Sequence, residues 1–298
     1  MKTISKAIIF TVISVSILFS QQLISSRHEF IGYNIGNSNP FYPQVNEVPD
    51  GQSGVTALAV GQDGNVYGGT SATNGKSCYL ITYKTKSNLV AEFYELDKTI
   101  KGQPKIGRAL VSGQDGFIYG GTSIYSDTLF VFADSTRNKS YVGGHLFRFK
   151  EGKLSSVEDL GVVLPAEGIR VLASDPKRER LYGLTEPGYR FFIYDIKTKK
   201  LTVRQDVDLT MEKENCYNQI LLVRKGLALA IDKKGCVWGS AYKNKLFRYN
   251  PEGDKLEVTS FVMPASYGHT DRDGLGALIA SPDGLLYGGT QADGVLFR

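Results

Sequence analysis

The chain has 298 residues, of which 42% are hydrophobic and 22% are charged, and this balance excludes an intrinsically disordered chain. Its formal net charge is +5, and no basic run is dense enough to predict a nucleic-acid-binding surface. The 33 glycines and 17 tyrosines, without a long apolar pattern at helical spacing, predict an all-β fold of short strands and tight turns.

The N-terminal segment differs in composition from the rest of the chain. Lys2 and Lys6 precede an apolar run over residues 7–19, which is short for a membrane span and has the length of a signal-peptide core. We therefore predict a signal peptide over residues 1–26, no membrane span in the mature chain, and a secreted, periplasmic or extracellular location. An uncleaved anchor is the alternative interpretation.

From residue 58 onward one pattern occurs five times: an apolar run, a turn, and a second run with one aromatic residue. The copies are LAVGQDGNVYGGTS (58–71), LVSGQDGFIYGGTS (110–123), LASDPKRERLYGLT (172–185), LAIDKKGCVWGSA (229–241) and LIASPDGLLYGGT (278–290). Asp and Gly favour the tight turns of β-hairpins, so each copy predicts two antiparallel strands. A hairpin cannot bury its own apolar face, and copies of this kind stack as the blades of a β-propeller.

A third strand is predicted after each hairpin, at residues 79–84, 145–150, 191–196, 245–250 and 295–298, and a fourth after the first four copies, at 90–97, 154–161, 201–208 and 256–263. The fifth copy lacks a fourth strand, whereas residues 29–36, EFIGYNIG, resemble a fourth strand with no hairpin before it. We therefore predict one domain over residues 27–298, a β-propeller of five four-stranded blades closed by an N-terminal strand that completes the last blade. The alternative is a fragment of a larger ring.

The long, polar connections of the predicted blades lie on one face, around the mouth of the central channel, and such loops often carry function. The richest is residues 266–274, SYGHTDRDG. Its Tyr267, His269 and Arg272 offer a proton carrier, a base near neutral pH and a cation for a carboxylate, so they are candidate catalytic residues for an acidic sugar. The alternative is a polar loop whose Asp and Gly residues set its turns.

Positive charge is predicted around the same mouth. Arg108, Arg170 and Lys225 fall at or near the starts of three innermost strands, where they would attract and orient an anionic ligand. The alternative is that the arginines pair with acidic residues such as Glu167. The remaining candidate ligand-binding residues of the mouth are Tyr189, Arg190, His145 and Asp273.

No motif predicts a cofactor or a metal site, and we expect neither. Cys78, Cys216 and Cys236 are too few and too scattered for a zinc site or a disulfide scaffold. Single aspartates one blade apart cannot supply the oxygen ligands of calcium. Nucleotide loops, haem-attachment motifs and nucleophile elbows are missing from the sequence.

In their repeat pattern the five copies resemble the secreted bacterial β-propellers, whose five-bladed relatives include arabinanase-like glycosidases and tachylectin-like lectins. The loop at 266–274 has the kinds of residue that propeller polysaccharide lyases of the ulvan type use. Three functions stay open: a binding module for an anionic glycan or a protein partner at the mouth, a lyase-like enzyme acting on uronic-acid polysaccharide, or a structural surface or assembly component. We favour the binding module, leave enzymatic activity open, and expect a monomer.

Overall fold

The computed structural model describes residues 48–49, 51–72, 76–87, 89–125, 140–209, 226–265, 274–291 and 293–298. The chain divides into two compact units, Met1–Glu47 and Val48–Arg298, and the second contains every described strand. The predicted signal peptide and the predicted strand at 29–36 lie outside the described residues. Within the described ranges, no helix has the length and apolar character needed to cross a membrane.

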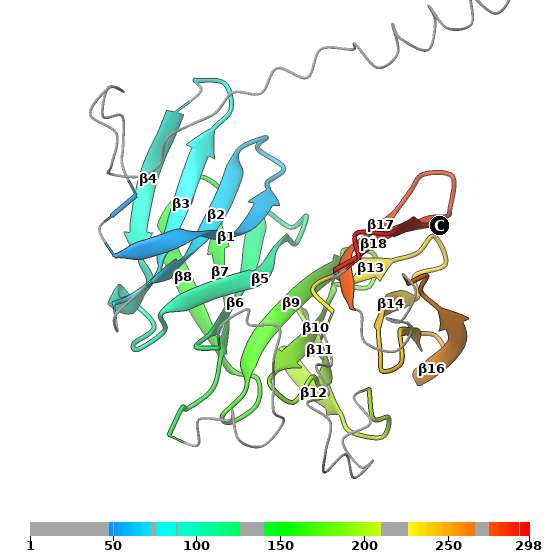
Figure 1. Cartoon of the computed structure of the whole chain (residues 1–298). Helices are drawn as coiled ribbons and strands as arrows, with labels where there is room; N and C mark the ends of the chain where they lie inside the picture. The colour runs from blue at the N-terminus through cyan, green and yellow to red at the C-terminus, as the bar shows by residue number, and fades with distance from the viewer. Residues whose placement is uncertain are drawn as a thin grey trace, which may run out of the picture. The chain divides into compact units, whose positions relative to one another are not determined.

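The described strands form antiparallel groups in chain order (Figure 1). The first group is β1 (Gln52–Val60), β2 (Val66–Ala72), β3 (Tyr79–Lys84) and β4 (Leu89–Glu95), followed by the short 3-10 helix η1 (Leu96–Lys98). The second is β5 (Lys105–Ser112), β6 (Phe117–Ser123), β7 (His145–Lys150) and β8 (Lys153–Val162). The third is β9 (Gly168–Asp175), β10 (Arg180–Glu186), β11 (Phe191–Asp195) and β12 (Lys200–Arg204).

Two further groups follow. The fourth is β13 (Ala230–Ile231), β14 (Val237–Ser240), β15 (Lys245–Asn250) and β16 (Lys255–Val262), and its first strand has 2 residues. The last described group is β17 (Leu275–Ala280), β18 (Leu286–Thr290) and β19 (Leu296–Phe297). These strands confirm the predicted all-β class.

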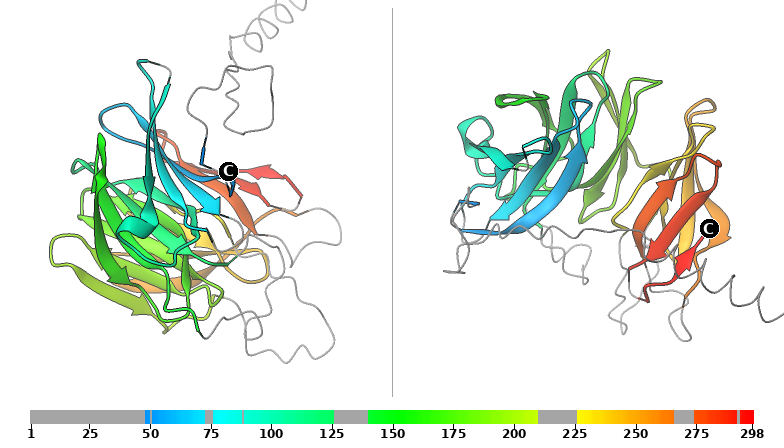
Figure 2. Two further views of the ribbon diagram at one scale, coloured as in Figure 1. Left: turned by 90° about the vertical axis from the view of Figure 1, so that its left-hand side faces the viewer. Right: turned by 90° about the horizontal axis from the view of Figure 1, so that it is seen from above.

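Within each group every strand pairs with the next strand along the chain in antiparallel register. The first strands of neighbouring groups also meet, and Arg108 of β5 pairs with Val171 of β9 in parallel register. Figure 2 shows the groups following one another in chain order, from blue through green to red. The first strand of each group is therefore its innermost strand, as a propeller requires.

The aspartate of the repeat holds the aromatic residue of the following strand. Tyr67 donates its hydroxyl hydrogen to Asp63 at 2.6 Å, and Tyr119 donates to Asp115 at 2.8 Å. Burial raises the pKa of the Tyr67 phenol, and the Asp63 carboxylate raises it further. Because the other Asp63 oxygen accepts a turn amide from Asn65 at 3.0 Å, the aspartate fixes both the turn and the ring. The equivalent pairs in the last two copies are Trp238 with Asp232 (2.8 Å) and Tyr287 with Asp283 (3.0 Å).

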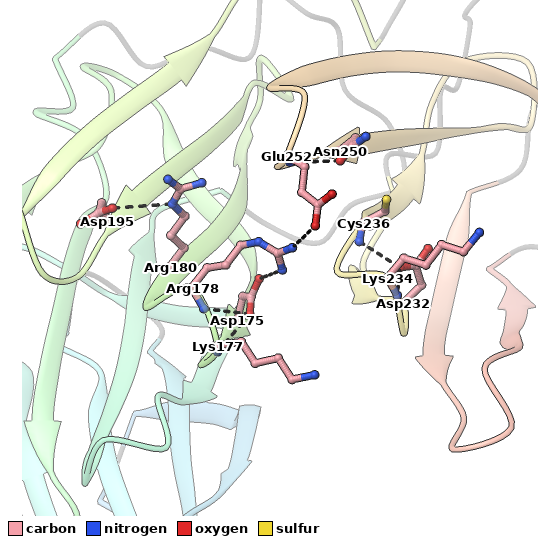
Figure 3. A network of polar contacts seen from close by, with 10 residues as sticks. All are labelled: Asp175, Lys177, Arg178, Arg180, Asp195, Asp232, Lys234, Cys236, Asn250 and Glu252. Carbon is pink, nitrogen blue, oxygen red and sulfur yellow. Dashed lines mark hydrogen bonds and ion pairs between the residues drawn. The ribbon is translucent and has the colours of Figure 1, made fainter.

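The third copy departs from this arrangement. Asp175 accepts a hydrogen bond at 3.1 Å from Arg178, which also reaches Glu252 of the fourth group at 3.3 Å (Figure 3). The Asp175 carboxylate is buried, whereas the Glu252 carboxylate is exposed to water, which screens the outer contact. The third and fourth groups are thus linked at their turns by a charged contact of modest strength.

The glycines that follow each aromatic residue make room for other strands. A Cβ added at Gly120 would lie 2.2 Å from the ring of Phe147, on the third strand of the same group. One added at Gly121 would lie 2.5 Å from Ile169, on the innermost strand of the next group. The two glycines of the Tyr-Gly-Gly sequence therefore determine how closely strands can approach within one group and between neighbouring groups. The first contact recurs at Gly68 with Ile81, Gly183 with Phe192, Gly239 with Phe247 and Gly288 with Phe297.

We predict that Gly120→Ala lowers the free energy of unfolding by about 1–3 kcal/mol, because the added methyl group overpacks the core around the fully buried Phe147. Gly54→Ala is the matched control, since nothing lies within 4 Å of the Cβ position there. Urea unfolding followed by intrinsic fluorescence measures both variants. Equal unfolding midpoints would contradict the role assigned to Gly120.

Candidate functional site

The candidate site is the face where the long connections meet, and we call it the connection face. In an antiparallel four-stranded group, the connection from the second to the third strand lies at the same end as the connection to the next group. The described parts of this face include residues 76–78, 96–104, 124–125, 140–144, 163–167, 187–190, 205–209, 226–229, 241–244 and 263–265. The candidates Tyr267, His269, Arg272, Asp273 and Lys225 lie outside the described residues.

Arg170, on β9, is buried in an ion pair at this face. Its Nη1 lies 2.7 Å from Oε2 of Glu186, and its Nε donates to the carbonyl oxygen of Gly226 at 3.0 Å. The other oxygen of Glu186 accepts from the hydroxyl of Ser123 at 2.6 Å. The pair therefore ties the second, third and fourth groups together. For Arg170 the structure therefore agrees with the alternative interpretation of the predicted positive charge at the mouth, in which the arginines pair with acidic residues. The partner is Glu186.

Tyr189 and Arg190 lie in the β10–β11 connection, and Tyr189 points into the protein. Its buried hydroxyl donates to the carbonyl oxygen of Ser240 at 3.1 Å, and burial raises its pKa, so it stays protonated at neutral pH. The backbone N–H of Arg190 donates to the Thr185 hydroxyl at 3.0 Å, and that hydroxyl donates to Glu167 at 2.9 Å. Tyr189 thus joins the third group to the fourth and offers no exposed ring to a ligand.

A second polar cluster, centred on the buried Lys105, was missed by the sequence analysis. Lys105 Nζ donates to the carbonyl oxygen of Tyr125 at 2.9 Å, and the Tyr125 hydroxyl donates to the carbonyl oxygen of Ala166 at 2.5 Å. The hydroxyl of Tyr141 donates to Gln103 at 2.7 Å. The two tyrosines therefore anchor both ends of the long β6–β7 connection. The position of these two tyrosines at the ends of a polar insertion is the sequence signal that could have indicated that the connection is anchored at both ends.

Arg108 and His145 are the remaining described candidates. Arg108, on β5, is exposed and forms no side-chain hydrogen bond or ion pair in the described part of the chain. His145 begins β7, and its Nδ1 lies 2.9 Å from Asp159 on the neighbouring β8. Among the described candidates, Arg108 is therefore the one cation that faces solvent without a partner.

A cavity of about 500 Å³ opens on the connection face of the first group. Gln52 is already engaged there, since its amide donates to the Ser77 carbonyl oxygen at 3.0 Å. Tyr79 and Glu95 also line the cavity, and burial, followed by the charge of Glu95, raises the pKa of the Tyr79 phenol. The cavity thus offers hydroxyl and carboxylate groups that can form hydrogen bonds. Across the described ranges, no three His, Cys, Asp or Glu side chains are placed to hold a metal ion.

No family model and no curated protein matches the chain. Among solved structures it is similar to the periplasmic gluconolactonase PpgL of Pseudomonas aeruginosa, with a TM-score of 0.54 and 12% identity over 79% of this chain and 65% of that one. It is also similar to U3-55K, with a TM-score of 0.51 and 11% identity over 84% of this chain and 63% of that one. The chain thus spans less than two thirds of the length of both. At these identities the likeness shows the fold alone, which is propeller-like.

We predict that Glu186→Gln lowers the free energy of unfolding by about 3–5 kcal/mol, because it leaves the buried Arg170 without a counter-charge. Glu158→Gln is the matched control, since Glu158 pairs with Arg148 near the surface and such pairs contribute little. Chemical unfolding measures both variants. A Glu186 variant as stable as the control would show that the pair does not hold the three groups together.

Proposed function

We propose that the chain is a propeller-type binding module that holds an anionic partner, an acidic glycan in the first place, at the connection face. The observation that carries the proposal is the exposed Arg108, which has no partner in the described part of the chain and lies on an innermost strand. Guanidinium groups bind carboxylate and sulfate in bidentate geometry. An exposed cation on a strand that lines the channel is therefore suited to an anion entering from the mouth.

The surroundings of Arg108 support this role. Arg170 adjoins Val171, the strand partner of Arg108, and its guanidinium forms an ion pair with Glu186. Lys105 is buried and donates to the Tyr125 carbonyl oxygen. These internal contacts hold the innermost strands in place without using the Arg108 guanidinium. Because the strand that carries Arg108 is already held in place, only its side chain has to lose conformational freedom when the guanidinium binds.

The finer architecture and location are part of the same proposal. We propose a monomeric, secreted or periplasmic protein of five four-stranded blades, with residues 29–36 as the fourth strand of the last one. A largely apolar cavity of about 660 Å³ between the fourth and last groups supports this strand, because it extends from Trp238 and Phe261 of the fourth group to Phe297 of β19, with which the proposed strand would pair. In residues 29–36 the apolar Ile31, Tyr33 and Ile35 alternate, as a strand covering such a cavity requires.

The test is retention of the purified chain on immobilised polymers of uronic acids, with a neutral glucan as the reference polymer. We predict that Arg108→Ala raises the apparent Kd about tenfold, since a charge-assisted hydrogen bond contributes roughly 1.5–3 kcal/mol. Lys177→Ala is the matched control, because Lys177 is an exposed cation in the β9–β10 turn, at the opposite end of its group. Added salt should weaken binding of the parent chain.

Each result has a definite meaning. Equal loss in the Arg108 and Lys177 variants would indicate attraction by net charge and contradict the site. Failure of the parent chain to retain any uronic-acid polymer would contradict the glycan and favour a protein partner. Release of an unsaturated product, detected by ultraviolet absorbance and abolished in His269→Ala, would replace the binding module by the lyase-like enzyme.

A further inference from the structure

The cavity on the connection face of the first group is lined mostly by polar residues. Its volume of about 500 Å³ is in the range of small-molecule sites, and Tyr79 and Glu95 line it. Tyr79 begins β3, Glu95 ends β4, and the two residues are directly opposite each other in the antiparallel register. Their side chains therefore lie on the same face of the sheet, as neighbours at the cavity.

The wall around these two residues is held by hydrogen bonds within the protein. The Gln52 side-chain amide donates to the Ser77 carbonyl oxygen at 3.0 Å and accepts from the Thr70 hydroxyl at 2.6 Å. The backbone N–H of Asp97 donates to the Ser77 hydroxyl at 3.1 Å. The Asp97 carboxylate accepts from the backbone N–H of Gly102 at 2.8 Å. Because this wall is already formed, a ligand does not have to order it on binding.

Tyr79 and Glu95 supply the groups that a ligand can use. The Tyr79 phenol and the Glu95 carboxylate have no hydrogen-bond partner among the described residues. Burial, followed by the charge of Glu95, raises the pKa of the Tyr79 phenol, so the phenol remains a donor at neutral pH. The cavity therefore presents one hydroxyl donor beside two carboxylate acceptor oxygens. Ile124 and Pro104 add apolar surface to the same lining.

The charges at this cavity balance one another. Among the described lining residues the charged ones are Lys76, Glu95 and Asp97, and Asp97 is 3.1 Å from the Lys101 ammonium group. Two carboxylates and two ammonium groups carry no net charge, so the cavity selects neither an anion nor a cation by its field. Recognition here depends on hydrogen bonds and shape.

We propose that this cavity is a second binding site, which takes a neutral sugar unit with adjacent hydroxyl groups. One hydroxyl donates to the Glu95 carboxylate, its neighbour accepts from the Tyr79 phenol, and the C–H groups of the sugar ring contact Ile124 and Pro104. The bond to the carboxylate is charge-assisted and is therefore the stronger of the two. The inference goes beyond the proposed anion site, because it needs no cation and does not involve Arg108.

Isothermal titration calorimetry with small saccharides tests the site. The neutral probes are glucose, galactose, mannose and cellobiose, and the charged comparisons are glucosamine and glucuronate. We predict that the parent chain binds at least one neutral probe and that added salt leaves this affinity unchanged. Glu95→Gln should raise the apparent Kd about tenfold and Tyr79→Phe about fivefold, because each substitution weakens or removes one hydrogen bond.

Glu92→Gln is the matched control, because it removes the same charge from the same strand. Glu92 lies three residues before Glu95 on β4, so its side chain is on the opposite face of the sheet and does not line the cavity. Its apparent Kd should equal that of the parent chain. The urea midpoints of all three variants show whether each one is folded.

Failure of the parent chain to bind any neutral probe overturns the proposal. Equal losses in the Glu95 and Glu92 variants overturn it as well, since the ligand would then lie elsewhere. A preference for glucosamine that salt weakens overturns the neutral class and indicates a cation site. The anion site is tested apart from this one: retention on the neutral glucan reports on the cavity, and the additional retention on uronic-acid polymers reports on Arg108.

Discussion

The rest of the structure depends on one constraint, which is that no four-stranded sheet of this chain can bury both of its faces alone. Each of the first four groups presents an aromatic residue to the group that follows and receives a leucine from it, as Tyr67 and Leu110 do at the first junction between neighbouring groups. The glycines after the aromatic residue let the next innermost strand come close enough for that contact. The repeated sequence therefore explains the stacking, because every copy contains both the leucine and the aromatic residue that a junction needs.

Polar groups at the connection face follow from this stacking. Where innermost strands of neighbouring groups approach, their side chains leave water, and a buried charge is stable only with a partner. Arg170 meets that requirement with Glu186, and Lys105 donates to the Tyr125 carbonyl. Arg108 lies on the same kind of strand but remains in solvent, where an unpaired charge costs little. Its exposure is what distinguishes a candidate binding group from the structural cations around it.

The repeated pattern was sufficient to predict the all-β class, the strands and the turns, because those depend on residues close together in the sequence. It could not predict that Asp63 would also bind Tyr67, nor that Glu186 would be the partner of Arg170. Both contacts depend on how strands or loops align in three dimensions. Tyr189 shows the same limit, since its loop position suggested exposure, whereas the neighbouring group covers it. The candidates at residues 266–273 and Lys225 remain predictions.

The junctions and the connection face are physically coupled. Three groups meet at the Arg170–Glu186 pair, through the Ser123 hydroxyl of the second group and the Gly226 carbonyl oxygen of the fourth. Their positions therefore depend on how Leu172 and Leu229 pack against the neighbouring groups. An anion that contacted several groups at once would bind best when the junctions between those groups are formed. By linkage, such a ligand stabilises the packed arrangement of the groups by the same free energy by which that packing increases its affinity. Recognition at the connection face then depends on the junctions between the groups as well as on the residues that touch the ligand.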